Sequence, residues 1–178
     1  MTRIFAVLFA ALTAVTLAAC GSDSDFNDAD VAFVTGMVPH HRQAVEMAQM
    51  ADGAGASPEV QDLADRIEAA QGPEIDTMTG FLEDWDQPVP DASDMGSMDD
   101  MQGMMSDIEM QEMMALSGTE FNERFLTEMI EHHKGAIAEA QQEQQDGQNA
   151  DAIDLAEQIE AAQAEEITEM EGLLEAGS

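Results

Sequence analysis

The sequence predicts an all-α fold: a four-helix bundle built from two duplicated helical hairpins, with a Met-rich connector that contains a short helix. The segments "FVTGMVPHHRQAVEMA" (33–48) and "FLTEMIEHHKGAIAEA" (125–140) align without a gap at an offset of 92 positions. At the same offset, "LADRIEAAQGPEIDTMTGFLE" aligns with "LAEQIEAAQAEEITEMEGLLE". Apolar residues recur every three or four positions in both copies, which is the period of an amphipathic helix. A duplicated unit of about fifty residues is typically one supersecondary element, here a hairpin.

The first hairpin is expected over residues 31–85 and the second over 118–178. In the first, "DGAGASP" separates two helices, with Ser57 as the N-cap and Pro58 in the first turn of the second helix. In the second, Gly147 breaks the pattern and Asn149 is the expected cap. Because neither hairpin can bury its apolar face alone, residues 31–178 should form one domain.

Residues 86–117 form the connector between the hairpins. It opens with the proline-bearing "DQPVPDASD" and continues into a segment rich in methionine. Ser106 with Glu109, and Ser117 with Glu120, fit the capping-box pattern. We therefore expect a short helix from about residue 107 to 116, followed directly by the third bundle helix.

The first 19 residues are interpreted as a lipoprotein signal peptide. Arg3 precedes an apolar run that is too short for a membrane span and has the length of a secretory signal. The run ends in "LAAC", which resembles the bacterial lipobox, so Cys20 is the expected lipidation site and residues 20–30 the lipidated cysteine and tether. The alternative is ordinary cleavage near Ala19. The expected location is the bacterial cell envelope, outside the cytoplasm and lipid-anchored to the membrane.

Composition excludes several partners and sites. The chain has 38 acidic residues against five Lys plus Arg, a formal net charge of −33. Such a surface repels nucleic acid and anionic lipid headgroups, so membrane contact is expected only through the lipid anchor. Cys20 is the only cysteine, which excludes disulfides within the chain and cysteine metal sites.

The four histidines form two doublets, and hairpin geometry predicts that they share one layer in the middle of the bundle. Residues equidistant from a hairpin turn lie at the same level. The layer is therefore expected to contain His40, His41, His132 and His133 together with Gln71, Glu74, Gln163 and Glu166. Helical spacing places methionines on the same core-facing stripes, namely Met37, Met47, Met78, Met129 and Met170.

Two interpretations of this layer stay open on the residues alone. One is a His/Glu/Gln hydrogen-bond network that sets the register of the bundle. The other is a metal site, because imidazole suits copper, zinc, iron and nickel, and thioether favours copper(I). A di-iron site is disfavoured since the Glu-x-x-His signature is absent. A metal-dependent oxidase is the third option, and the chain has no tyrosine to support it.

The connector contains a second group of methionines. Soft thioether ligands in a flexible, glycine-bearing loop can hold copper(I), which indicates a soft-metal loop at Met95, Met98, Met101, Met104 and Met105. For Met110 to Met114, packing against the bundle is favoured instead, because methionine fills irregular apolar gaps.

The repeated "M-x-x-HH" pattern, the following "Q..EI..M" and the Met-rich connector together resemble a bacterial secreted family, domain of unknown function 305. This resemblance implies a ferritin-like bundle in the cell envelope. It also implies copper as the metal, since some members are periplasmic copper-binding proteins. Carried over by position, the signature covers Met37, His40, His41, Met47, Met129, His132 and His133, while Glu139 stands where similar sequences have methionine.

The leading hypothesis is a non-enzymatic, lipid-anchored protein that binds copper, or another divalent metal, through paired histidines and methionines. Its role would be sequestration, or hand-over to and from a metal donor or acceptor protein. The alternative is a structural or protein-interaction bundle whose buried polar network holds no physiological metal.

Overall fold

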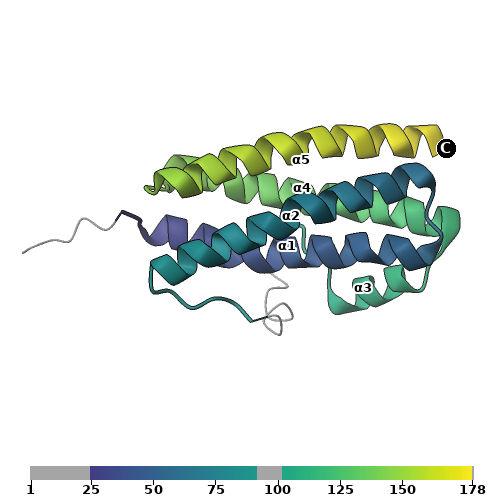
Figure 1. The fold of residues 1–178 in the computed structure, drawn as a ribbon. Coiled ribbons are helices and arrows are strands. Elements are labelled where there is room, and N and C mark those ends of the chain that lie inside the picture. Colours follow the sequence, from purple (N-terminus) through teal and green to yellow (C-terminus); the bar gives the residue numbers. More distant parts are fainter. Residues whose placement is uncertain (1–24, 92–101, 178) are drawn as a thin grey trace, which may run out of the picture.

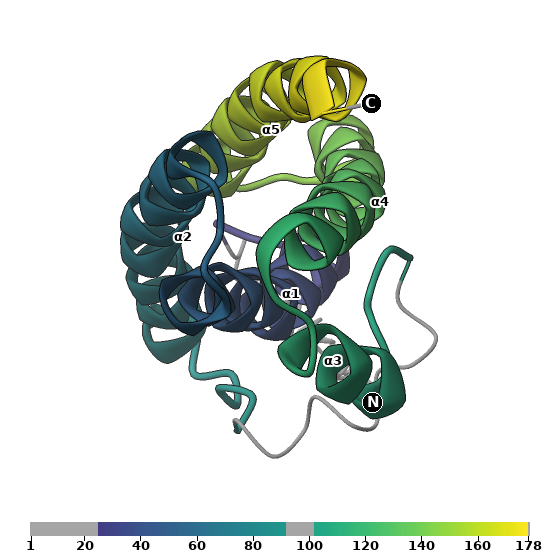
Figure 2. The same cartoon turned by 90° about the vertical axis from the view of Figure 1, so that its right-hand side faces the viewer.

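The computed structural model describes residues 25–91 and 102–177 and places them in a helical bundle (Figure 1). Its helices are α1 (Asp28–Ala54), α2 (Pro58–Asp84), α3 (Asp107–Met114), α4 (Gly118–Asp146) and α5 (Ala150–Gly177). Figure 2, which looks along the bundle, shows the four long helices in the order α1, α2, α5, α4, with the short α3 outside them near α1 and α4. The predicted all-α four-helix bundle is confirmed, and the described part of the chain contains no strand.

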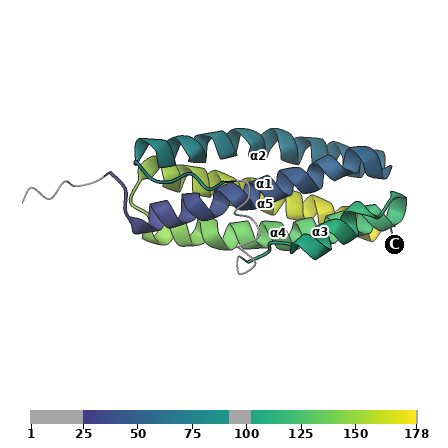
Figure 3. The ribbon, with the colours of Figure 1, turned by 90° about the horizontal axis from the view of Figure 1, so that it is seen from below.

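The two hairpins pack with α1 antiparallel to α4 (Figure 3). At one end, Asn27 Nδ2 donates to the Asp146 carbonyl at 2.9 Å. Near the other end, the Ser57 amide donates to Asn122 Oδ1 at 3.2 Å. Because the hairpins share one sequence pattern, this arrangement relates them by an approximate twofold axis through the middle of the bundle.

The helix ends follow local capping chemistry, with two differences from expectation. Helix α1 begins at Asp28 because Asn27 and Asp30 form a capping box. The last three residues of the expected tether are therefore helical. Ser117 makes no side-chain cap bond, so the predicted capping box there is wrong. The following residue, Gly118, has a φ of 57°, which takes the chain out of the geometry that a capping box needs.

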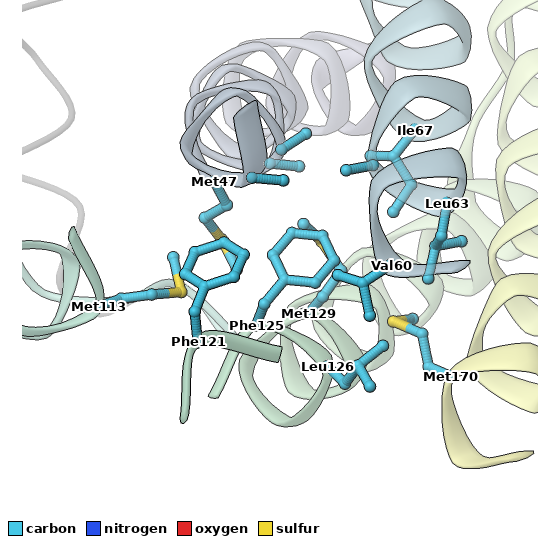
Figure 4. Packing of buried hydrophobic residues seen from close by; sticks show 14 of the residues in the cluster. Met47, Val60, Leu63, Ile67, Met113, Phe121, Phe125, Leu126, Met129 and Met170 are labelled. Carbon is cyan, nitrogen blue, oxygen red and sulfur yellow. The ribbon is translucent and has the colours of Figure 1, made fainter. Parts of the chain in front are cut away.

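The core consists of two apolar clusters, one toward each end of the bundle. The α3-side cluster, part of which is shown in Figure 4, contains Met47, Leu63, Ile67, Met105, Met113, Phe121, Phe125, Met129 and Met170 among others. The opposite cluster contains Phe33, Val34, Met37, Val38, Met78, Leu82, Ala136, Ala140, Leu155, Ala156 and Ile159. The histidine doublets lie between these clusters in the helix sequences. None of the described helices is both long enough and apolar enough to cross a membrane.

The end of the connector is fastened to α1 and α4 beside the doublets. Gln43 Nε2 donates to the Met105 carbonyl and Gln43 Oε1 accepts from the Met105 amide, both at 2.8 Å. A Cβ added to Gly135 would lie 1.8 Å from the Gln102 carbonyl oxygen, so glycine is required for this approach. The repeat offset aligns Gln43 with Gly135. The two copies have therefore diverged at the place where the connector crosses them.

The methionines of the connector and α3 differ in burial. Met113 is fully buried beside Phe121, as the packing interpretation expects, whereas Met114 is 66% exposed. Met105 is buried in the α3-side cluster and Met104 is half-buried, so Met105 is part of the core and not of a free loop. The expected sites at Cys20, Met95, Met98 and Met101 lie outside the described residues.

A pair of carboxyl groups, Asp30 and Glu143, joins α1 to the turn between α4 and α5. Asp30 Oδ1 accepts from the amides of Gln148 and Asn149 at 3.0 and 2.9 Å. Burial, together with the hydrogen bond to Asp30 and the charge of that residue, raises the pKa of Glu143 to about 8. At neutral pH, Glu143 is therefore largely protonated and carries little charge beside Asp30.

Replacing Glu143 with glutamine should stabilise the protein at alkaline pH and have little effect near pH 4.5. The pKa of Glu143 in the folded chain exceeds the ordinary value of 4.5, so the wild type loses stability as pH rises from that value through about 8. Glutamine keeps a donor toward Asp30 and does not ionise. Urea unfolding at about pH 5 and pH 8.5 measures the difference, with the exposed Glu175→Gln as the matched control. If Glu143→Gln is no more stable than the wild type at the higher pH, the raised pKa assigned to Glu143 is wrong.

Candidate metal centre

All four histidines are completely buried in the middle of the bundle. His40 and His41 come from α1, and His132 and His133 come from α4. Each has an exposed fraction of 0%. The period of 3.6 residues per turn explains why both members of a doublet are inside, since adjacent residues can flank the centre of a wide buried stripe.

His40 and His132 meet where the two hairpins join. Their ring centroids lie 3.7 Å apart, with an angle of 41° between the ring planes. They occupy equivalent positions in the two repeats. The contact therefore lies close to the approximate twofold axis and joins α1 directly to α4.

The outer member of each doublet is bound to a glutamate of its own hairpin. His41 Nε2 lies 2.8 Å from Glu74 Oε2, and His133 Nε2 lies 2.7 Å from Glu166 Oε2. Because a carboxylate only accepts hydrogen bonds, each Nε2 carries a proton, and in the neutral form of each ring the lone pair is then on Nδ1. Histidines that bind metals commonly have this carboxylate partner, which orients the ring and selects the tautomer.

Most of the polar atoms in this layer have no hydrogen-bond partner among the described residues. The unpaired atoms are both ring nitrogens of His40 and His132, Nδ1 of His41 and His133, both side-chain polar atoms of Gln71, and Oε1 of Gln163. Each buried, unpaired polar group costs about 1–3 kcal/mol. The described layer is therefore only partly paired, unlike a network whose members satisfy one another.

Burial also sets the protonation state of His40 and His132, the inner members of the two doublets. Desolvation, and then the nearby His41 and His133, lower the pKa of His40 to about 3, although the Gln102 carbonyl acts in the opposite direction. Desolvation and the neighbouring histidines likewise bring the pKa of His132 well below its ordinary value. Both rings are therefore neutral at pH 7, which is the form that binds metal ions.

Thioether sulfurs lie in the apolar clusters on both sides of the histidines. Met37 and Met78 belong to one cluster, and Met47, Met129 and Met170 to the other. All five are fully buried. No group of three or more His, Cys, Asp or Glu side chains forms a ready metal cage in residues 25–91 and 102–177. A metal in this layer would need methionine sulfur or a shift of side chains to complete its ligand set, and its ligands stay a prediction.

Two features of this centre were not identified from the sequence. Gln43 holds the connector in place, and the Gln102 carbonyl lies close enough to His40 to affect its pKa. The sequence does contain a signal for both features. The two repeats are similar on either side of this position, but Gln43 in the first aligns with Gly135 in the second. Glu139, which replaces an expected methionine, is half-buried, and burial raises its pKa to about 7.

Several solved structures resemble the chain over most of its length. A DUF305 protein from Streptomyces coelicolor, described as a candidate secreted protein, is 30% identical with a TM-score of 0.77, and the match covers 84% of this chain and 93% of that one. A DUF305 fragment from Deinococcus radiodurans is 30% identical with a TM-score of 0.76, covering 84% and 97%. CopM in its Cu(I)-bound form is 26% identical with a TM-score of 0.69, covering 83% and 96%. CopM is also described in Cu(II)-bound and Ag-bound forms.

None of the curated proteins matches the chain significantly. The family model described as "Domain of unknown function (DUF305)" matches residues 30–174, which include both doublets, the described connector and most of all five helices. The resemblance inferred from the repeated histidine pattern is thus confirmed, and the chain belongs to the DUF305 family.

Proposed function

We propose that this protein is a non-enzymatic copper-binding protein of the bacterial cell envelope, anchored by a lipid on Cys20. The observation that carries the proposal is a set of six buried histidine ring nitrogens without a hydrogen-bond partner among the described residues. Unpaired ring nitrogens in an apolar interior are destabilising, and a bound metal ion would compensate those that carry a lone pair. The CopM structures with Cu(I), Cu(II) and Ag support the choice of metal, and the secreted description of the Streptomyces relative supports the location.

The donor set explains why copper fits better than a harder cation. Neutral imidazole binds copper in both oxidation states, and thioether prefers copper(I). In the proposed site His40, His132 and the Nδ1 atoms of His41 and His133 supply nitrogen. Met37 and Met129, at equivalent positions in the two repeats, supply sulfur. Such a site suits sequestration, or hand-over to and from a metal donor or acceptor protein.

A copper titration of the full chain tests the proposal. Copper(I) and copper(II) are added in competition with a chromogenic chelator, and the wild type is compared with His40→Ala/His132→Ala. The variant should lose the tightest copper that the wild type binds. Glu74→Gln, which still accepts a hydrogen bond from His41 Nε2, should keep this copper with an affinity reduced about 10- to 100-fold, as is usual for a partner that only orients a ligand.

The matched control is Val34→Ala, a fully buried substitution in α1 that removes packing but no donor atom. It should lower the unfolding temperature and leave copper stoichiometry and affinity unchanged. The proposal fails if the histidine variant binds copper as tightly and in the same amount as the wild type. In that case the layer only joins the two hairpins, and substitutions there alter stability without any metal dependence.

A further inference from the structure

A second group of methionines gathers outside the histidine layer, where α3 lies beside α1. Four of them line one cavity of about 180 Å³: Met50 from α1, Met105 from the connector, and Met110 and Met114 from α3. Three separate segments of the chain thus bring thioethers to one small space. None of the four belongs to the donor set of the histidine layer.

Packing accounts for some of these methionines and not for others. Met105 is 5% exposed and Met113 is fully buried, so both contribute to the core. Met50 and Met110 are half-buried, and Met114 is 66% exposed. Exposed apolar surface contributes no burial energy, so filling the core does not explain a methionine at position 114.

Comparison of the two repeats shows that some methionines of α1 have no counterpart in α4. The repeat offset aligns Met47 with Glu139 and Met50 with Gln142. Glu139 and Gln142 line the corresponding groove at the other end of the α1–α4 contact, which α3 does not cover (Figure 3). The two helices share one pattern, but at these two positions methionine occurs only in the copy that faces α3.

The surroundings of the cavity favour a cation and hold the sulfurs in place. The carboxylate residues Glu46 and Asp107 also line it, in a chain whose formal net charge is −33. The Gln43–Met105 hydrogen bonds fix the segment before α3. A capping box formed by Ser106 and Glu109 fixes the start of α3 itself. The cavity walls therefore come from anchored segments.

We propose that this cavity is a second binding site, for a soft monovalent cation such as Cu(I) or Ag(I), held by the sulfurs of Met50, Met105, Met110 and Met114. Neutral thioethers bind soft cations and are poor ligands for Mg²⁺, Ca²⁺ or other hard ions. The nearby carboxylates attract the charge without entering a sulfur ligand set. The site does not depend on the proposed function of the histidine layer, because the two share no donor atom.

Silver titration of the full chain tests the site with a redox-inert ion. Methionine methyl groups labelled with ¹³C are followed by NMR while Ag(I) is added to the wild type and to a Met50→Leu/Met110→Leu/Met114→Leu variant. In the wild type the signals of these three residues and of Met105 should shift together. The triple variant should bind one silver fewer, and its Met105 signal should no longer shift.

Two further variants keep the result decisive. Met113→Leu removes a thioether from the same helix without touching the cavity, so it should bind silver as the wild type does. Met114→Leu alone alters an exposed side chain and should fold normally, yet weaken the binding of this silver ion by at least about tenfold, a loss that is typical even for residues that only orient a metal ligand. Unchanged silver stoichiometry in the triple variant, or unchanged affinity in Met114→Leu, would overturn the proposal. The copper site of the histidine layer is tested separately: copper that is lost in His40→Ala/His132→Ala, but kept in the triple methionine variant, is bound by that layer.

Discussion

Replacing His40 and His132 together with leucine should make the metal-free protein more stable, by about 2 kcal/mol at neutral pH. The two rings are fully buried and contact each other at a tilt of 41°, but none of their four nitrogens has a hydrogen-bond partner among the described residues. Exchanging unpaired polar groups for apolar groups of similar volume removes the desolvation penalty that they impose. Urea unfolding of the metal-free wild type and variant measures the change.

The same substitution should also make the free energy of unfolding depend less on pH in acidic solution. The pKa of His40 is lowered from 6.5 to about 3, so the unfolded chain binds the proton more readily than the folded chain does. His40 therefore makes stability fall as pH decreases from 6.5 toward 3, by about 1.4 kcal/mol per pH unit within that window. The difference in stability between variant and wild type should consequently grow as pH is lowered through this range.

Substitution of the outer histidines, His41 and His133, provides the control and should change stability in the opposite direction. His41→Leu with His133→Leu removes the donors to Glu74 and Glu166, which leaves two partly buried carboxylates without their histidine partners. That pair of changes should destabilise the protein by about 3 kcal/mol or more, as expected when one side of a buried ion pair or charged hydrogen bond is removed. If the inner substitution destabilises the metal-free protein as much as the outer one, the inner rings are stabilising and the argument from their unpaired nitrogens is wrong.

Replacing Gly135 with alanine should destabilise the protein by about 1–3 kcal/mol, the range for forcing extra volume into a packed site. The added methyl group would lie 1.8 Å from the Gln102 carbonyl oxygen and 2.6 Å from the Gln102 carbonyl carbon. Both are backbone atoms, so the connector itself must move. That movement pulls against the Gln43–Met105 hydrogen bonds, and amide exchange at Met105 should become faster.

Gly172→Ala is the matched control, because Gly172 also lies inside a long helix and an added Cβ there meets nothing within 4 Å. That change should stabilise the protein by up to about 1 kcal/mol through helix propensity alone. Chemical denaturation compares the two variants with the wild type, and hydrogen exchange reports on the Met105 amide. A Gly135→Ala protein as stable as Gly172→Ala, with Met105 still protected, would show that the connector does not depend on this close approach.

Much of the architecture could be predicted because it depends on local periodicity and on the duplication. The positions of α1, α2, α4 and α5 follow from apolar spacing and from turn residues such as Gly55 and Gly147. The presence of Glu74 and Glu166 in the histidine layer follows from hairpin geometry, although that geometry does not select His41 and His133 as their partners. These features need only the geometry of a helix and of an antiparallel hairpin, both of which repeat along the chain.

The docking of the two hairpins and the course of the connector could not be predicted in this way. Periodicity states which face of a helix is buried, but it does not state which helix of the other hairpin covers that face. Only the packing of α1 against α4 brings His40 onto His132 and leaves their nitrogens unpaired within the described chain. Only the connector's approach to Gly135 explains why the copies differ at Gln43. The sequence by itself thus determined the helices and the level of each histidine, because these depend on local geometry. The tertiary structure decided which histidines meet and what covers them, because contacts between distant segments depend on how whole helix surfaces pack.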